Sequence, residues 1–226
     1  MNDAKQDLAG YIDHTLLKPF ATEADIAQLC REAREYRFFS VCVNSCWVPY
    51  VRTQLQGSGV NLCSVVGFPL GAMSTEAKVY EAQTAVSQGA QEIDMVINIG
   101  WAKGGMLEAV EGEIRSIKSA IGDILLKVII ETCYLTDEEK IAVCQAAVRA
   151  GAEYVKTSTG FGTGGANPED LQLMLDTVNG KALVKASGGV RDAETAMRYI
   201  DMGVRRLGTS SGIQIVGGQA AAEGSY

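Results

Sequence analysis

Short apolar runs recur along the chain at nearly even spacing, and a helical pattern lies between each run and the next. Runs of this length are typical of β-strands that are buried on both faces. They predict eight strands, at residues 11–13, 40–44, 61–67, 92–98, 125–131, 153–158, 182–187 and 206–210. The intervening segments carry helix-start signals: Thr136 and Glu139 fit a capping box, and Asn167 stands directly before a proline. The chain is therefore predicted to alternate strand and helix eight times.

The 226 residues divide into about 28 per unit, enough for a strand, a helix and two short loops. No linker interrupts the series before a glycine- and alanine-rich segment at about residues 217–226. We therefore expect an α/β fold, a single (β/α)8 TIM barrel over residues 1–226 that ends in a short flexible tail. An open doubly wound sheet is the alternative, and it usually has fewer strands. In a barrel, the active site lies at the C-terminal ends of the strands.

Two copies of the pattern V-K-x-S-x-G, at residues 155–160 and 184–189, begin as apolar runs and end in glycine. They place Lys156 and Lys185 inside the sixth and seventh predicted strands. A lysine in such a strand is costly to bury unless it is paired or neutralised. Two of them on neighbouring strands indicate a site that needs an uncharged amine, as a nucleophile that forms a Schiff base with a carbonyl does.

Lys127 occupies a comparable position in the fifth predicted strand. If all three lysines point inward, Lys156 is the middle one, with a cation on either side. Like charges close together disfavour each other's ionised form. We therefore assign Lys156 as the nucleophile, and Lys185 as the cation that perturbs it and shuttles protons. In the alternative interpretation, the lysines form structural ion pairs with inward acids such as Asp94 and Glu131.

Carboxylates in the predicted strands are candidates for proton transfer. Asp94 lies between isoleucine and methionine in the fourth strand, where a buried carboxylate must find a partner. We assign it as a general acid/base for the carbinolamine and Schiff-base steps, and a role as counter-ion for the lysines is compatible with this. Asp13 closes the first predicted strand and is an accessory candidate, for which a structural role is equally reasonable.

Glycine-rich turns follow the last three predicted strands, and the last turn leads into a short apolar stretch at residues 213–216. Backbone N–H groups in such turns, with hydroxyl groups beside them, suit a phosphate. Barrels often bind phosphate in the loops after strands seven and eight. The candidate phosphate ligands are Gly160, Gly188, Gly189, Ser210 and Ser211. The alternative is that these turns need glycine only for tight geometry.

One of these turns, residues 160–165, also fits the dinucleotide pattern G-x-G-x-x-G. That fingerprint requires a helix that opens directly on the loop. Here Asn167 and Pro168 supply a separate helix start. The pattern is therefore weak evidence for an NAD-dependent dehydrogenase, and we expect no cofactor.

Composition and charge exclude several classes of function. The net charge is −7 and no run of Lys or Arg occurs, which argues against a nucleic-acid partner and against an anionic membrane. The apolar runs are too short to cross a bilayer, and residues 1–7 show no signal-peptide segment. His14 is the only histidine, which removes most histidine-based catalytic and metal sites, and no metal is expected. None of the six cysteines forms a C-x-x-C pair, so we expect reduced thiols in a cytoplasmic protein, with Cys46 accessible on a loop.

Eight stretches of the chain together resemble the deoxyribose-phosphate aldolases. They lie in order along all eight predicted units, at residues 12–19, 40–44, 66–71, 92–98, 127–132, 154–161, 184–191 and 208–212. The resemblance implies a class I aldolase without metal, which reversibly cleaves 2-deoxy-D-ribose 5-phosphate to D-glyceraldehyde 3-phosphate and acetaldehyde. It implies Lys156 as the Schiff-base lysine and Asp94 and Lys185 as proton donors and acceptors. It also implies that the terminal Tyr226 reaches the active site.

Two other functions stay open at this point. Another Schiff-base aldolase that acts on a different phosphorylated sugar would carry the same lysines and phosphate turns. A non-catalytic barrel that binds a phosphorylated metabolite would carry the same fold. The expected partners are a phosphorylated sugar and acetaldehyde. We also expect the chain to form a homo-oligomer, with a dimer as the favoured form.

Overall fold

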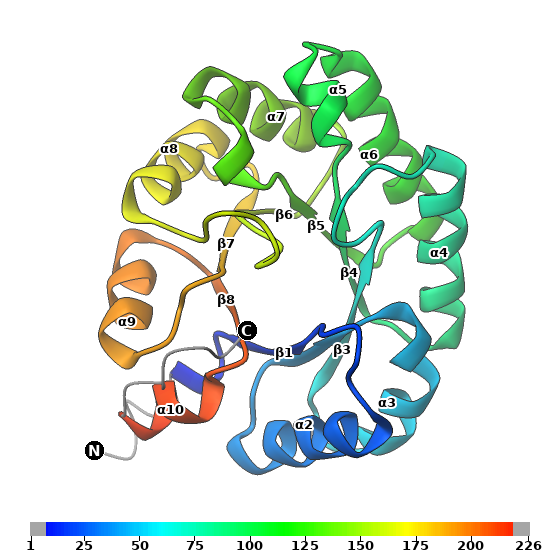
Figure 1. Cartoon of the computed structure of the whole chain (residues 1–226), viewed down its shortest axis with the longest axis vertical. Helices are drawn as coiled ribbons and strands as arrows, with labels where there is room; N and C mark the ends of the chain where they lie inside the picture. The colour runs from blue at the N-terminus through cyan, green and yellow to red at the C-terminus, as the bar shows by residue number, and fades with distance from the viewer. Residues whose placement is uncertain (1–7, 219–226) are drawn as a thin grey trace.

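Eight parallel strands close into a barrel in the computed structural model, which describes residues 8–218 of the chain (Figure 1). Neighbours in the sequence are neighbours in the barrel, and the last strand pairs with the first to complete it. The strands are β1 (Ile12–Leu16), β2 (Ser40–Val43), β3 (Asn61–Val66), β4 (Glu92–Val96), β5 (Leu125–Ile129), β6 (Tyr154–Lys156), β7 (Leu183–Ser187) and β8 (Arg206–Thr209). The predicted (β/α)8 barrel is thereby confirmed.

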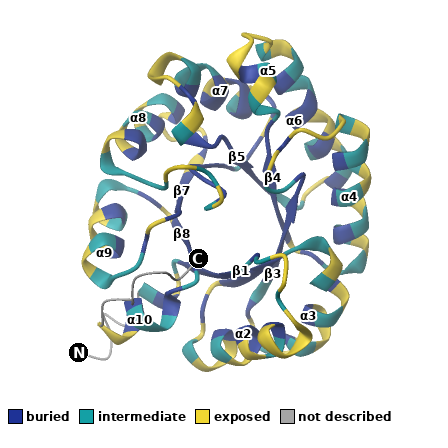
Figure 2. Cartoon of the chain, viewed as in Figure 1, coloured by how far each residue is buried: buried dark blue, intermediate teal, exposed yellow. Residues whose placement is uncertain are grey.

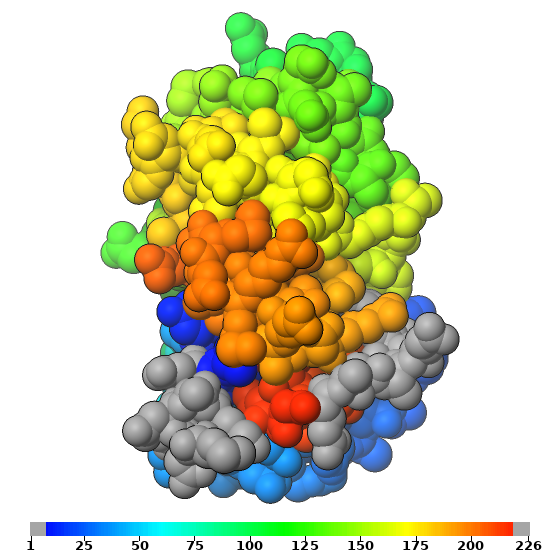
Figure 3. Space-filling view, turned by 90° about the vertical axis from the view of Figure 1, so that its left-hand side faces the viewer, coloured from blue at the N-terminus to red at the C-terminus, as the bar shows by residue number. Residues whose placement is uncertain are grey.

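Helices surround the strands (Figure 1). They are α2 (Glu23–Tyr36), α3 (Val48–Gln54), α4 (Thr75–Gln88), α5 (Ile99–Lys103), α6 (Leu107–Ile121), α7 (Asp137–Arg149), α8 (Pro168–Val178), α9 (Ala193–Met202) and α10 (Gly212–Gly217). Short 3-10 turns, η1 (Ser45–Trp47) and η2 (Thr132–Tyr134), precede α3 and α7. Figure 3 shows α8 and α9 side by side on one face, with α10 next to α9. No helix within the described residues is long and apolar enough to span a membrane.

Helix boundaries follow the signals in the sequence. The Thr136 hydroxyl accepts a hydrogen bond from the Glu139 N–H, and the Glu139 carboxylate accepts one from the Thr136 N–H, which completes the predicted capping box. The Asn167 side chain caps α8 directly ahead of Pro168. The short apolar stretch after the last turn is helical, as α10. The expected tail from about residue 217 lies almost wholly outside the described residues.

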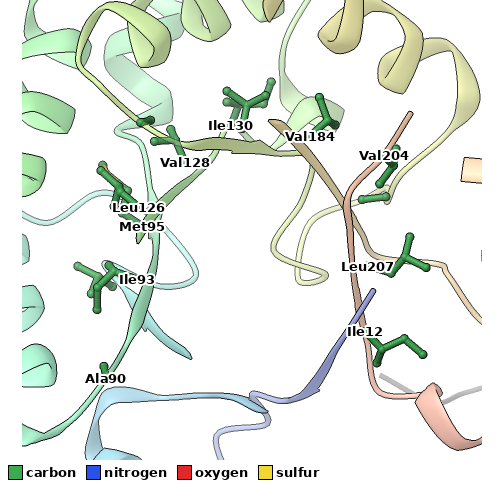
Figure 4. Close-up of a cluster of buried hydrophobic side chains, with 14 of the residues drawn as sticks. Ile12, Ala90, Ile93, Met95, Leu126, Val128, Ile130, Val184, Val204 and Leu207 are labelled. Atoms are coloured by element: carbon green, nitrogen blue, oxygen red, sulfur yellow. The ribbon is translucent and has the colours of Figure 1, made fainter. Parts of the chain in front are cut away.

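The apolar core lies between the strands and the helices. Because side chains alternate along a strand, every second residue points away from the barrel axis. Figure 4 shows this outward set, which includes Ile12, Ile93, Met95, Leu126, Val128, Val184 and Leu207. The strands are buried on both faces (Figure 2), and the residues between the outward positions fill the inside of the barrel, many of them with charged groups.

The first strand is longer than predicted. It covers Ile12–Leu16 instead of residues 11–13. The prediction ended too early because polar residues interrupt the apolar pattern there, although all of them are buried. Conversely, the sixth strand ends at Lys156, two residues before the predicted end. Thr157 is still held at the sheet edge, where its N–H donates to Lys185 O at 3.2 Å.

Candidate active site

Three lysines meet inside the barrel. Lys156 and Lys185 are register partners on β6 and β7, so their side chains lie side by side. On β5, the register partner of Lys156 is Ile129, whereas Lys127 pairs with Tyr154. The expectation that Lys156 lies between two lysines at the same height in the barrel is therefore wrong. Lys127 lies one inward-facing position further from the C-terminal ends of the strands. The side chains of all three lysines are at most 3% exposed.

Asp94 on β4 joins the three lysines. Its Oδ2 accepts hydrogen bonds of 2.8 Å from both Lys156 Nζ and Lys185 Nζ. Its Oδ1 accepts one of 2.9 Å from Lys127 Nζ and one of 3.2 Å from the thiol of Cys63. Burial by itself raises the pKa of Asp94, but the three nearby lysine side chains outweigh burial and hold that pKa well below its usual range. Asp94 is therefore an ionised carboxylate at neutral pH.

Six of the buried charged groups form a closed ring of alternating sign, which we call the ion ring. In order around the ring they are Arg206, Asp13, Lys185, Asp94, Lys127 and Glu92. Arg206 closes it by donating from Nε to Asp13 Oδ1 (2.8 Å) and from Nη2 to Glu92 Oε2 (2.7 Å). Three cations and three carboxylates cancel, so the ion ring is neutral as a whole. Lys156 stands outside it, and within the described residues its ion-pair partner is Asp94 alone.

The ion ring favours the charged forms of Lys185, Lys127 and Asp13. Burial lowers the pKa of Lys185, but the carboxylates of Asp13 and Asp94 outweigh burial and raise that pKa. For Lys127, the same competition between burial and nearby negative groups also ends with a raised pKa. Burial raises the pKa of Asp13, whereas Lys185 and Arg206 lower it, and the net direction is down. Lys185 and Lys127 are therefore ammonium groups at neutral pH.

The structure brings most of the candidate catalytic residues together. Those that meet in the barrel are Lys156, Lys185, Lys127, Asp94 and Asp13. Glu131, the other acid expected to pair with lysine, instead accepts a hydrogen bond of 3.2 Å from the Thr159 N–H, and burial raises its pKa. Glu92 and Arg206 were not predicted as site residues. Glu92 and Asp94 occupy alternate positions of the fourth apolar run, and this spacing is the signal that both carboxylates point inward. Tyr226 lies outside the described residues.

The loops after β6 and β7 pack tightly against each other at the C-terminal end of the barrel. The Ala166 N–H donates to Ser187 O and to Gly188 O, both at 3.0 Å. A Cβ atom on Gly165 would lie 2.4 Å from Gly188 O, so only glycine permits this approach. Gly188 and Gly189 both have φ of 80°, in the left-handed region that favours glycine. Two of the candidate phosphate glycines thus sit in a rigid turn beside the lysines.

The loop that contains the G-x-G-x-x-G pattern reaches over the barrel mouth. Its Gly160 has φ of 86°, but α8 begins only at Pro168, so no helix opens directly on the loop as a dinucleotide site requires. Phe161 in this loop contacts Phe68 edge to face, with ring centroids 5.3 Å apart. Phe68 follows β3, so the contact joins loops from non-adjacent strands across the mouth.

The two candidate serines differ in their surroundings. Ser210 lines a cavity of about 310 Å³ beside the loop after β1, together with Thr15 and Lys18. The Ser211 N–H donates to Thr209 Oγ1 at 2.9 Å and so belongs to the turn ahead of α10. Ser210 is therefore the one of the two that borders this cavity, whose lining also includes the acids Asp25 and Glu32.

Two further hydroxyl groups are buried in the matched patterns. Ser158 and Ser187 lie two residues after Lys156 and Lys185, at matching positions of the repeated pattern. Neither hydroxyl has a hydrogen-bond partner within residues 8–218. A buried hydroxyl without a partner is costly, and a bound substrate with hydroxyl groups would supply one.

Cys42, Cys63 and Asp94 are the group of described residues whose donor atoms lie close enough to hold a metal, all within 4.8 Å of one another. Both oxygens of Asp94 already accept hydrogen bonds from lysines. Burial raises the pKa of Cys63 well above its usual value, which disfavours the thiolate that a metal needs. The surrounding ammonium groups also oppose a further cation, so the site is poorly suited to a metal.

Known proteins of similar sequence are aldolases. The sequence model of the DeoC/LacD family aldolases matches residues 8–216. A deoxyribose-phosphate aldolase of Brevibacillus brevis is 56% identical over 216 residues, which cover 96% of this chain and 98% of that protein. The deoxyribose-phosphate aldolase of Deinococcus radiodurans is 53% identical over 211 residues, 93% of this chain and 96% of that protein.

Solved structures agree with these sequences. The aldolase QR15 has a TM-score of 0.90 at 40% identity and covers 93% of this chain and 95% of its own. The deoxyribose phosphate aldolase of Aeropyrum pernix, described as a tetramer, has a TM-score of 0.87 at 36% identity, with 94% and 91% covered. Fold and site thus define a TIM-barrel protein with a lysine–carboxylate centre suited to carbonyl chemistry. The chain belongs to the DeoC/LacD family of aldolases and is a lyase.

Proposed function

We propose that this aldolase reversibly cleaves 2-deoxy-D-ribose 5-phosphate to D-glyceraldehyde 3-phosphate and acetaldehyde, with Lys156 as the amine that forms the Schiff base. The observation that carries the proposal is that Lys156 is the one lysine of the three that stands outside the neutral ion ring. The names of the curated relatives, at 53% and 56% identity, support the substrate.

Charge balance favours a neutral amine on Lys156. The ion ring is balanced by itself, so an ammonium group on Lys156 would add a positive charge that the ring does not compensate. Burial and the ammonium groups of Lys185 and Lys127 disfavour this charge, while the hydrogen bond to Asp94 favours it. An amine in its neutral form can attack a carbonyl.

Schiff-base formation needs proton transfers that the surrounding groups supply. The Lys156 Nζ lone pair attacks C1 of the open-chain sugar, and the carbonyl oxygen takes up a proton to give the carbinolamine. Asp94 Oδ2 lies 2.8 Å from both Lys156 Nζ and Lys185 Nζ, so it relays protons between the two amines. A proton from Lys185 then helps the carbinolamine hydroxyl to leave as water, which gives the protonated Schiff base.

The protonated Schiff base draws electrons from the C2–C3 bond. Asp94 accepts the proton of the C3 hydroxyl, directly or through water, and the bond breaks to release D-glyceraldehyde 3-phosphate. The enamine left on Lys156 takes a proton at C2, and hydrolysis then releases acetaldehyde and restores the amine. The reverse sequence forms the carbon–carbon bond.

The loops after β6, β7 and β8 provide the phosphate end of the site. Their glycines Gly160, Gly188 and Gly189 are in the left-handed conformation, in which successive backbone N–H groups can bind an anion, and Ser210 adds a hydroxyl from the next loop. The unpartnered hydroxyl groups of Ser158 and Ser187 lie nearer the lysines and are suited to the hydroxyl groups of the sugar.

Borohydride reduction in the presence of acetaldehyde tests the role of Lys156. Hydride converts a Schiff base into a stable secondary amine, so peptide mapping by mass spectrometry should find one ethyl group on Lys156. The Lys156→Arg variant should show no labelled barrel lysine. Labelling confined to Lys185, or an absence of label on the wild-type protein, would contradict the assignment.

A panel of phosphorylated sugars tests the substrate. The value of kcat/KM should be highest for 2-deoxy-D-ribose 5-phosphate, compared with ribose 5-phosphate and with unphosphorylated 2-deoxyribose. A clear preference for another phosphorylated sugar would leave the Schiff-base chemistry in place and refute the substrate.

We further propose that the whole chain, residues 1–226, forms one catalytic domain, that it assembles as a homo-oligomer, and that it works in the cytoplasm. The absence of C-x-x-C pairs among the six cysteines supports the compartment. The tetramer described for the Aeropyrum pernix protein supports self-association without favouring the dimer. Light scattering on the purified chain distinguishes monomer, dimer and tetramer.

A further inference from the structure

Arg206 and Glu92 lie at the closed end of the barrel. They are the first residues of β8 and β4, whereas the substrate enters at the opposite ends of the strands. Arg206 is 2% exposed, and its guanidinium lies 3.6 Å from the centroid of the Phe39 ring. Neither residue is placed to touch a substrate that reacts at Lys156.

A purely structural role gives a poor account of these two charges. The inside of a TIM barrel is ordinarily filled by branched apolar side chains. Buried ion pairs are often no more stabilising than apolar residues of similar volume, because each ion must leave water. The chain nevertheless buries Arg206 and Glu92 and joins both to the lysine cluster through shared carboxylates.

Two branches of the ion ring connect this closed end to Asp94. On one branch, Asp13 binds Arg206 through Oδ1 and Lys185 through Oδ2. On the other branch, Glu92 Oε2 accepts hydrogen bonds from both Arg206 and Lys127. Both branches end on Asp94, the carboxylate that also holds Lys156. A change of charge at either end residue therefore leaves the ring unbalanced next to Lys156.

We propose that Arg206 and Glu92 are positioning residues that set the protonation of Lys156 from the closed end of the barrel. They do so by keeping the ion ring neutral, so that the ring adds no net charge of its own next to Lys156. Loss of the Arg206 charge leaves the ring with an excess carboxylate, and Lys156 then keeps its proton to higher pH. Loss of the Glu92 charge leaves an excess cation, and Lys156 then loses its proton at lower pH.

The other groups that face Lys156 stay constant under these substitutions. These groups are Lys185 on β7, Lys127 on β5 and Asp94 on β4. Cys42 on β2 and Glu131 after β5 also interact with its charge. The pKa of Cys42 is lowered by its hydrogen-bonding interaction with Cys63, and the pKa of Glu131 is raised by burial. Arg206 and Glu92 thus change the ring charge without removing a direct neighbour of Lys156.

The pH dependence of Schiff-base trapping tests this inference, which rests on the proposed role of Lys156. The rate of ethyl labelling of Lys156 by acetaldehyde and borohydride is followed against pH, and its midpoint is compared between variants. Arg206→Gln should move the midpoint up by about one pH unit, since a unit charge roughly 10 Å away acts at an effective dielectric of about 20. Glu92→Gln should move it down by a similar amount. The double variant should return close to the wild-type midpoint, because its ring is neutral again.

Two matched variants separate charge from packing. Arg206→Lys keeps the charge and should keep the midpoint within a few tenths of a pH unit. Glu113→Gln removes a buried carboxylate that pairs with Lys78 at 2.8 Å between α4 and α6, outside the barrel interior, and should not move the midpoint. If Arg206→Gln does not fold, Glu92→Gln still tests the sign, because loosened packing gives no reason for easier deprotonation.

Opposite shifts of the single variants, cancelled in the double variant, support the inference. Shifts in the same direction, no shift, or a double variant that stays displaced would overturn it. These outcomes differ from failure of the proposed function, in which the wild-type protein itself carries no ethyl group on Lys156.

Discussion

Lys156 and Lys185 share one acceptor: each Nζ donates a 2.8 Å hydrogen bond to Oδ2 of Asp94. The two lysines are register partners on neighbouring strands and occupy the same place in a repeated pattern, yet their surroundings differ. Lys185 has a second carboxylate, Asp13, whereas Lys156 has no second one within the described residues. Lys156 shares its one carboxylate with Lys185, so it is held less strongly as an ammonium group than Lys185 is. This difference distinguishes the proposed nucleophile, Lys156, from Lys185, which stays charged.

The asymmetry predicts that the two lysines differ in their effect on stability. Lys156→Leu leaves the ion ring neutral, so the free energy of unfolding should stay within about 1 kcal/mol of wild type or rise, while activity is lost. Lys185→Leu leaves Asp13 and Asp94 short of a cation and should lower the free energy of unfolding by about 3–5 kcal/mol. Urea denaturation at pH 7, followed by circular dichroism, measures both values. Equal losses of stability in the two variants would contradict the description of Lys156 as a group outside the ring.

Most strands of the barrel could be predicted from the sequence because parallel strands buried on both faces appear as short apolar runs. The first strand was predicted too short because His14 and Thr15 are polar but buried. The pattern of apolar and polar residues does not show whether a polar side chain points into the barrel interior or into solvent. The pair Lys156 and Lys185 was found because a repeated motif placed both lysines within apolar runs.

Other parts of the site could not be predicted for physical reasons. Arg206 and Glu92 begin their strands, and charged residues at strand ends are usually solvated, so burial there needs the closed barrel to reveal it. The contact between Phe68 and Phe161 joins loops far apart in the sequence, and local pattern carries no information on it. The depth of Lys127 in the barrel depends on how β5 and β6 are aligned. An error of two residues in that alignment moves an inward-facing side chain by one layer of the barrel interior.

Acid should remove the stabilisation that the ring carboxylates provide. The folded-state pKa values of Asp13 and Asp94 are lowered below the unfolded value of about 3.9. Such groups contribute stability that is fully present above the unfolded pKa and is lost as pH falls through the folded pKa. The urea midpoint should therefore fall steeply below about pH 4. Asp13→Asn should be less stable than wild type at pH 7, and the difference should shrink between pH 4 and pH 3. A difference that stays constant over this range would show that Asp13 is not stabilised as a carboxylate.

Ser210 should act on the phosphate and not on the reacting carbons. A hydrogen bond to a charged group is worth about 1.5–3 kcal/mol, so Ser210→Ala should raise KM for 2-deoxy-D-ribose 5-phosphate by roughly tenfold or more, with a smaller effect on kcat. Unphosphorylated 2-deoxyribose should be cleaved by the variant at nearly the wild-type kcat/KM. Ser116→Ala, an exposed serine on α6, is the matched control. Equal loss with both sugars would place Ser210 elsewhere in the mechanism.

The aromatic pair at the mouth should limit which aldehydes enter. Phe161 and Phe68 meet edge to face at 5.3 Å, and Phe161 is 44% exposed, so its loss should cost little stability while it widens the opening. Phe161→Ala should raise kcat/KM for bulky acceptor aldehydes relative to D-glyceraldehyde 3-phosphate in the synthetic direction.

Phe68→Ala should change this ratio in the same way, and the double variant should add little, because either truncation already removes the contact. Tyr80→Ala, which truncates a ring that is 73% exposed on α4, controls for the loss of a surface aromatic residue. The measurement is a competition between two aldehydes for acetaldehyde, with both products quantified. An unchanged ratio in both single variants would mean that the pair packs the loops together without restricting entry.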